Sequence, residues 1–199
     1  MGYLETKLPT LKKKFTALNI PLLYTFSRFY HDVKNKKQRL ARTLILLSAI
    51  TGKKPLKILL ADDDEEDREI FTEAIREVAP QVEVNMAVNG QQLMHMLNAQ
   101  DTPLPHIIFL DLNMPIKDGH ECLSEIRSDQ RLKHIPIIIY STSTSREHID
   151  ETFKSGASFY MPKPDSFRDL KTLAKKVISL DWDNFSKPVK EKFVLSVGT

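Results

Sequence analysis

Five short apolar runs recur between residues 57 and 161 and divide this part of the chain into regular units. They are residues 57–61, 82–88, 106–110, 137–141 and 158–161. After each run, apolar residues return every three or four positions, as they do along one face of an amphipathic helix. After the first run, these residues are Ile70, Phe71, Ala74, Ile75 and Val78. The pattern predicts five strands that alternate with five helices, a (βα)₅ arrangement.

The strands are expected to be parallel, because near-continuous apolar runs are typical of strands covered on both faces. Asp64 is placed to cap the first helix, Gly156 to end the fourth and Asp165 to cap the last, while Asn89-Gly90 predicts a turn. The connections are short and the crossovers should be right-handed. The fold class is therefore α/β, a doubly wound sandwich around a five-stranded parallel sheet.

Composition divides the chain into three parts. We assign residues 1–55 to a basic leader, residues 56–180 to the (βα)₅ domain and residues 181–199 to a C-terminal tail. Residues 1–57 carry 13 Lys and Arg against 2 Asp and Glu, whereas the rest of the chain carries 16 against 24. The net positive charge therefore belongs to the leader and does not indicate a nucleic-acid-binding domain. Trp182, Phe185 and Phe193 in the tail are expected to pack back on the domain.

The leader is expected to be poorly ordered, or present only because the start codon is assigned too early. The alternatives are a basic amphipathic segment that contacts anionic lipid or a partner, and a secretory signal whose apolar region is residues 44–50. No apolar run reaches the roughly 18 residues that span a bilayer. Cys122 is the only cysteine, which excludes an internal disulfide and fits a cytoplasmic location.

Polar residues stand at the ends of four of the predicted strands. The carboxyl ends of parallel strands meet at one edge of the sheet, where ligands bind in open α/β folds. If the first and third strands are neighbours, three carboxylates share one pocket. The residues, in chain order, are Asp62-Asp63, Asp111, Ser141-Thr142 and Lys163-Pro164.

Three carboxylates in one pocket raise one another's pKa values or attract a hard cation, and oxygen ligands of this kind suit Mg²⁺. With Lys163 and the Ser141 hydroxyl, they form a site suited to phosphoryl transfer, in which Asp111 attacks in line. Taken singly, each residue has an ordinary alternative. Asp111 could start a turn, residues 62–67 a solvated helix, and Lys163 could be a surface lysine. Their occurrence at successive strand ends argues against coincidence.

Residues 56–180 resemble the receiver domain of response regulators in two-component signalling. The resemblance implies the flavodoxin-like strand order 2-1-3-4-5 and a phosphoacceptor role for Asp111. It is carried by the polar residues at the strand ends and by three further segments, Asp111-Leu-Asn-Met-Pro115, Asp118-Gly119 and Gly156-Ala-Ser-Phe-Tyr160.

The resemblance also implies a role for each residue around Asp111. Mg²⁺ would be held by Asp62, Asp63, Asp111 and the backbone carbonyl of Asn113, with Asp62 acting largely through water. The phosphoryl group would be stabilised by Ser141, Thr142 and Lys163. As Ser141 moves towards it, Tyr160 would turn inward as the aromatic switch. The Lys163–Pro164 bond would be cis, and Asn113 and Ser143 would tune dephosphorylation.

Two features are similar to stand-alone receivers found beside phytochrome-type sensor kinases, the hydroxyl-rich run Ser141-Thr-Ser-Thr-Ser145 and the tail with Trp182. They imply a single-domain phosphoacceptor that is not a turnover enzyme, although it catalyses its own phosphorylation and slow dephosphorylation. Its partners would be a histidine kinase or histidine phosphotransfer protein and a downstream protein target that reads a phosphorylation-dependent surface. Specific DNA binding is not expected, and homodimerisation stays open.

The same residues argue against several other functions. A phosphatase with an Asp nucleophile would need a second Asp at the position of Asn113 as its general acid. A dinucleotide-binding module would need a glycine-rich motif after the first strand, and none is present. A DNA-binding regulator would need an output domain after the receiver. A receiver-like scaffold that is not phosphorylated is the alternative, and it is disfavoured because the acidic pair and the lysine are both present.

Overall fold

The computed structural model describes residues 55–100, 102–182 and 184–198. Residues 1–54 of the predicted basic leader lie outside the described residues, so the expectations about that segment stay predictions.

Five parallel strands form one sheet in the order β2-β1-β3-β4-β5, which confirms the predicted fold class and strand order. Each strand is four or five residues long, and β1, β3 and β4 are buried along almost their whole length. Residues of β2 and β5, at the two edges, flank this buried centre. The strands are β1 (Lys57–Ala61), β2 (Glu83–Ala87), β3 (Ile107–Leu110), β4 (Ile137–Ser141) and β5 (Phe159–Pro162).

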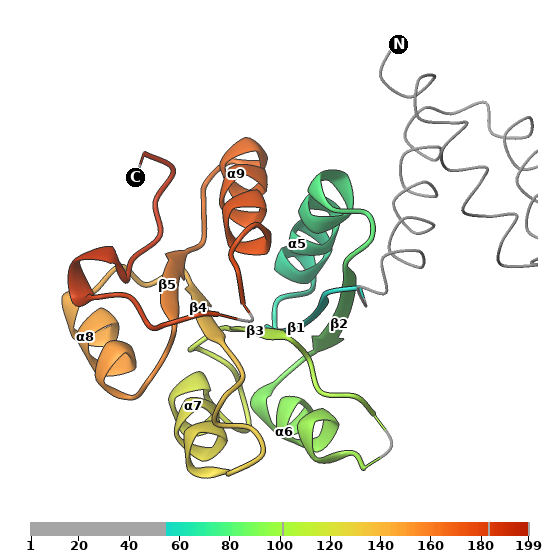
Figure 1. Ribbon diagram of the computed structural model, residues 1–199, viewed down its shortest axis with the longest axis vertical. Helices are drawn as coiled ribbons and strands as arrows, with labels where there is room; N and C mark the ends of the chain where they lie inside the picture. The colour runs from blue at the N-terminus through green and yellow to red at the C-terminus, as the bar shows by residue number, and fades with distance from the viewer. Residues whose placement is uncertain (1–54, 101, 183, 199) are drawn as a thin grey trace, which may run out of the picture. The chain divides into compact units, whose positions relative to one another are not determined.

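Helices cover both faces of the sheet, as Figure 1 shows, with α5 and α9 on one face and α6, α7 and α8 on the other. Each helix follows its strand, and four of the five described helices bury an apolar stripe against the sheet, whereas α8 buries Thr152 and packs the partly buried Ile149 and Phe153 there. The helices are α5 (Glu65–Val78), α6 (Gly90–Asn98), α7 (Gly119–Ser128), α8 (Arg146–Lys154) and α9 (Phe167–Ile178).

Alternate residues of the strands supply two separate cores. On one face, Ile58, Leu60 and Phe109 pack with Phe71 of α5 and Leu173 of α9. On the other face, the alternating strand partners pack against α6, α7 and α8; they include Leu59, Ala61, Ile108, Leu110, Ile137 and Ile139. Because adjacent strand residues face opposite cores, the sheet is apolar on both sides, as the continuous apolar runs predicted.

A side chain caps the N-terminus of each of these helices, and two of the capping residues differ from the sequence prediction. Asp64 caps α5 as predicted, since its carboxylate accepts hydrogen bonds from the backbone N–H groups of Glu66 and Asp67. Asn89, predicted to lie in a turn, instead caps α6. Ser166, not Asp165, caps α9, because the Ser166 hydroxyl accepts a bond from a backbone N–H in the first turn.

Pro162 is the last residue of β5, at an edge of the sheet. A proline lacks the backbone N–H that a central strand would need, and edge strands tolerate this loss. The next residue restores the pairing, since the Lys163 N–H donates to the Ser141 carbonyl at 2.9 Å. The ladder between β4 and β5 therefore extends to the residue that enters the pocket.

The C-terminal tail packs back on the domain, as predicted. Phe193 is fully buried beside Phe153 and Tyr160, and Trp182 donates from Nε1 to the Val177 carbonyl at 3.0 Å. Backbone bonds join the tail to β5 on both sides of residue 194: Tyr160 N–H donates to the Phe193 carbonyl, and Leu195 N–H to the Tyr160 carbonyl. The tail thus covers the outer edge of β5.

Candidate functional site

The carboxyl ends of β1 and β3 bring three acids together. Asp62 and Asp63 follow β1, Asp111 follows β3, and one carboxylate oxygen of each lies within 4.8 Å of the others. The strands place them so because β1 and β3 are parallel neighbours that end level with each other, with Ala61 beside Leu110. The structure therefore confirms that these three predicted residues share one pocket.

Asp111 is held by the backbone around it. Its N–H donates to the Ala61 carbonyl at 2.9 Å, and its Oδ1 accepts from the Leu112 N–H at 2.8 Å. Gly119 passes so close that an added Cβ would lie 2.1 Å from the Asp111 carbonyl oxygen, so no larger residue fits there. Burial raises the pKa of Asp111, an effect that the Lys163 charge and neighbouring backbone N–H groups reduce.

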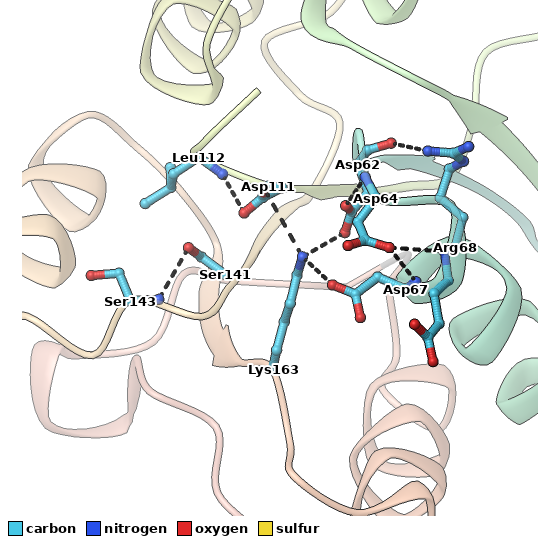
Figure 2. Close-up of polar contacts among 10 residues, drawn as sticks. Asp62, Asp64, Asp67, Arg68, Asp111, Leu112, Ser141, Ser143 and Lys163 are labelled. Carbon is cyan, nitrogen blue, oxygen red and sulfur yellow. Dashed lines mark hydrogen bonds and ion pairs between the residues drawn. The ribbon is translucent and has the colours of Figure 1, made fainter. Parts of the chain in front are cut away.

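Lys163 enters the pocket from the end of β5 and lies near acids from three other elements, β1, α5 and β3. Its Nζ lies 2.8 Å from Asp62 Oδ2, 2.7 Å from Asp67 Oδ2 and 4.0 Å from Asp111 Oδ2 (Figure 2). Burial alone would lower the pKa of Lys163, but the hydrogen bonds to Asp62 and Asp67 outweigh it and raise the pKa. Lys163 is therefore a charged ammonium in the acidic pocket.

The Lys163–Pro164 bond is trans, since the described residues contain no cis peptide bond. The cis prediction is wrong for this structure. A trans bond is intrinsically favoured even before proline, and Lys163 is already oriented by its backbone bond to Ser141 and its ion pairs.

Asp62 is the acid most strongly affected by its surroundings. Its side chain is fully buried, and this burial raises its pKa to about 6, although Lys163 and the Asp64 N–H act in the opposite direction. Its Oδ2 has an ion pair to Lys163 but accepts no well-aligned hydrogen bond. A buried carboxylate in this state, next to two other carboxylates, fits the oxygen-ligand set that Mg²⁺ takes.

The residues predicted to flank the phosphoryl group differ in how deeply they are buried. Ser141 is buried, and its Oγ accepts from the Ser143 N–H at 3.3 Å, as Figure 2 shows. Asn113 and Thr142 are exposed, and Ser143 is half-buried. Their predicted roles, and the predicted Asn113 carbonyl ligand, stay predictions.

Tyr160 is fully buried, and its hydroxyl donates to the Ser143 carbonyl at 2.7 Å. The tail contributes to this burial, since Phe193 packs against the ring and the Tyr160 backbone pairs with Phe193 and Leu195. The inward turn of the ring on phosphorylation stays a prediction.

Two residues near Asp111 have features that the sequence analysis missed. The run of acids at residues 62–67 is also typical of a solvated helix start, yet the Asp67 carboxylate is an ion-pair partner of Lys163. Its place in the first turn after the Asp64 cap was the available signal. Ile116 is 74% exposed at φ +71, in the left-handed region that a β-branched residue adopts only under strain. No sequence signal pointed to Ile116.

The family model of the response regulator receiver domain matches residues 58–175. The chain belongs to this family. The match spans the strands that carry all three pocket acids and Lys163, so the response regulator signature and the pocket geometry concern the same residues.

Similar proteins include single-domain response regulators. Response regulator Rcp1 of Synechocystis is 28% identical over 67% of this chain and 94% of its own length. Chemotaxis protein CheY-3 of Vibrio cholerae is 31% identical over 62% of this chain and 92% of its own length. The crystal structure of the phosphorylated cyanobacterial phytochrome response regulator RcpA has a TM-score of 0.61 at 29% identity, covering 67% of this chain and 99% of RcpA.

A structure of Rcp1 in its Mn²⁺-bound form has a TM-score of 0.59 at 28% identity, over 68% of this chain and all of Rcp1. This relative shows that a response regulator of this kind takes a divalent cation. The spacing of Asp62, Asp63 and Asp111 is compatible with such an ion. The helices that the structure describes include none with the length and apolar character to cross a membrane.

Proposed function

We propose that this response regulator receives a phosphoryl group from a phosphohistidine on the carboxylate of Asp111. The observation that carries the proposal is the convergence of three acids and Lys163 at the carboxyl ends of β1, β3 and β5. Family membership supports signalling by a phosphoacceptor. What we propose beyond family membership is that Asp111 is the acceptor, and that the residues around it have the roles described below.

In the proposed step, an Asp111 oxygen attacks the phosphorus of the phosphohistidine. A P–O bond forms as the P–N bond breaks, and the imidazole nitrogen keeps the electron pair of that bond. Asp62, Asp63 and the Asn113 carbonyl would hold Mg²⁺ beside Asp111. When bound, Mg²⁺ offsets the negative charge on the phosphoryl oxygens.

Lys163 supplies a second positive charge on the phosphoryl oxygens, and the Ser141 and Thr142 groups donate to them. Burial restricts access of water to Asp111, which is 5% exposed. Hydrolysis of the acyl phosphate would then depend on the residues at the rim, and we assign Asn113 and Ser143 to that role. The cycle is an acceptance and slow loss of one phosphoryl group, not steady turnover of a substrate.

The proposed output is a change in how the surface of α8, β5 and α9 binds a downstream protein. The tail forms part of this surface, because residues Phe193 to Leu195 pair with Tyr160 of β5. Ser141 lies between the pocket and this face: its neighbour Ser143 accepts from the Tyr160 hydroxyl. Movement of Ser141 towards a phosphoryl group would therefore act on the Tyr160–Ser143 bond, which biases a two-state surface.

The test is phosphorylation with acetyl phosphate and Mg²⁺, followed by intact mass measurement. We expect a gain of one phosphoryl group, lost in Asp111→Asn and in a sample with EDTA. Ser128→Ala, a change outside the pocket on α7, is the control that should keep the gain. A persistent, Mg²⁺-dependent gain in Asp111→Asn would contradict the assignment of the acceptor.

A further inference from the structure

Asp67 makes the shortest of the three contacts between Lys163 and an acid. Its Oδ2 lies 2.7 Å from Lys163 Nζ, compared with 2.8 Å for Asp62 Oδ2 and 4.0 Å for Asp111 Oδ2. In Figure 2 the Asp67 and Asp111 carboxylates lie on different sides of the Lys163 ammonium. The Lys163 side chain is 11% exposed and that of Asp67 is 34% exposed, so water reaches this contact mainly from the side of Asp67.

The local fold fixes where Asp67 points. Asp67 lies in the first turn of α5, and its N–H donates to Oδ1 of the cap residue Asp64 at 3.2 Å. α5 packs beside α9 on the same face of the sheet. α9 follows β5 in the chain, and Lys163 is the first residue after β5. Asp67 therefore reaches Lys163 from a rigid helix start, whereas Asp62 reaches it from a strand end.

The number of N–H donors on Lys163 indicates what its contact with Asp67 does. A lysine ammonium has three N–H donors and no acceptor. Asp67 accepts one of them, Asp62 Oδ2 lies 2.8 Å away as an ion-pair partner, and Asp111 at 4.0 Å lies beyond hydrogen-bond distance. Because two acids hold the ammonium on one side, an N–H group is left for the side of Asp111.

We propose that Asp67 is a positioning residue, which together with Asp62 holds Lys163 so that its remaining N–H faces the phosphoryl group on Asp111. The inference rests on the proposed function of Asp111. A lysine side chain is a flexible stem with a compact charge, and one anchor alone leaves it free to rotate. A second anchor on a separate element fixes the ammonium before the phosphoryl group arrives, which is where placement contributes to rate.

Asp67 is separable from the cation site. The three carboxylates with ligand spacing are Asp62, Asp63 and Asp111, and Asp67 is not among them. Loss of Asp67 should therefore change the use of Lys163 without removing a ligand of the divalent cation.

The experiment compares Asp67→Ala and Asp67→Asn with Glu66→Ala in the full chain. Glu66 is the adjacent residue, exposed, and its removal takes away the same unit charge one position from Asp67. We measure the rate of phosphorylation by acetyl phosphate at saturating Mg²⁺, Mn²⁺ affinity by electron paramagnetic resonance, and the NMR signal of the Lys163 ammonium.

We expect Asp67→Ala to lower the phosphorylation rate by about tenfold, because a misplaced group loses much of its effect on rate. Asp67→Asn should be intermediate, since its amide oxygen still accepts a hydrogen bond. Glu66→Ala should stay within about twofold of the parent rate, the size of effect expected for a change at an exposed position. The Lys163 ammonium signal should shift or broaden in Asp67→Ala and stay unchanged in Glu66→Ala.

Equal rates in Asp67→Ala and Glu66→Ala would overturn the inference. So would a loss of Mn²⁺ affinity in Asp67→Ala as large as its loss of rate, because the effect would then lie at the cation. If the parent protein takes no phosphoryl group, the proposed function fails and the ammonium signal decides the positioning role alone. An unchanged signal in Asp67→Ala would then overturn that role.

Discussion

The acidic pocket and the outer edge of β5 are neighbours in the fold that are held together by opposite means. The pocket gathers the buried acids Asp62 and Asp111 and the exposed Asp63 near Lys163, and the two buried charges are costly to remove from water. The edge is closed by apolar burial, since Phe193 of the tail is fully buried. β5 takes part in both, with Tyr160 pairing with the tail and Lys163 following its last residue.

Stability and chemistry are therefore divided between the two regions. Burial of charged groups lowers stability unless they are paired, whereas burial of aromatic rings raises it. Changes in the tail should therefore alter unfolding and leave phosphorylation of the folded protein intact. Changes in the pocket should do the reverse, and four measurements test this division.

The largest effect is expected in the tail. Phe193→Ala should lower the free energy of unfolding by about 3–5 kcal/mol, because it leaves a cavity beside Phe153 and Tyr160. Urea denaturation measures the change, and Val197→Ala, at a position 49% exposed, is the control that should change it little. A tenfold loss of the phosphorylation rate in folded Phe193→Ala protein would contradict the division.

The next effect is expected in the pocket. Asp63→Asn should weaken Mg²⁺ binding by about 10- to 100-fold, the range seen when groups that support a metal site are removed. The free energy of unfolding without Mg²⁺ should not fall, because one of three like charges has been removed. Calorimetric titration with Mg²⁺ measures the affinity, with Glu66→Gln as the charge-matched control. Unchanged affinity would exclude Asp63 as a ligand.

A pH dependence follows from Asp62. Burial raises its pKa to about 6, so protons compete with the cation, and Mg²⁺ affinity should fall by about tenfold per pH unit below pH 6. The folded state favours protonated Asp62, so its contribution to stability without Mg²⁺ is present at low pH and is lost as pH rises through about 6. Titrations between pH 5 and pH 7 test this, and Asp62→Asn should reduce the dependence to the part that Asp111 contributes.

The smallest effect is expected at the exposed ion pair that joins the tail to α8. Lys190 Nζ lies 2.8 Å from Asp150 Oδ1, and both side chains are largely exposed. Lys190→Ala should lower the free energy of unfolding by less than about 1 kcal/mol. A double-mutant cycle with Asp150→Ala measures the coupling. A coupling as large as the Phe193 effect would mean that charge, not apolar burial, closes this edge.

The fold and the pocket acids were predictable for the same reason. Apolar runs that end abruptly in Asp62 and Asp111 place charged groups where buried strands stop, and parallel strands bring their ends to one edge. These patterns are local, and the parallel topology alone brings the acids together. Their meeting could therefore be predicted without knowing how any side chain is oriented.

What escaped prediction depends on side chains that reach between elements. Asp67 and Lys163 are 96 positions apart, and the run of acids in which Asp67 lies is also what a solvated helix start contains. Phe193 was expected to pack on the domain, but its contact with the Tyr160 ring was not, because sequence periodicity does not show which core residue a tail side chain meets. The cap of α9 was misplaced by one residue because Asp165 and Ser166 are both good caps.

The pairing of the tail with β5 also bears on how the protein behaves in concentrated solution. An edge strand with free backbone groups is a template on which another chain can add and begin aggregation. Here the Tyr160 N–H and carbonyl are both used by the tail. A variant cut after Leu180, or one carrying a C-terminal fusion that pulls the tail away, would expose that edge and should precipitate at concentrations the full chain tolerates.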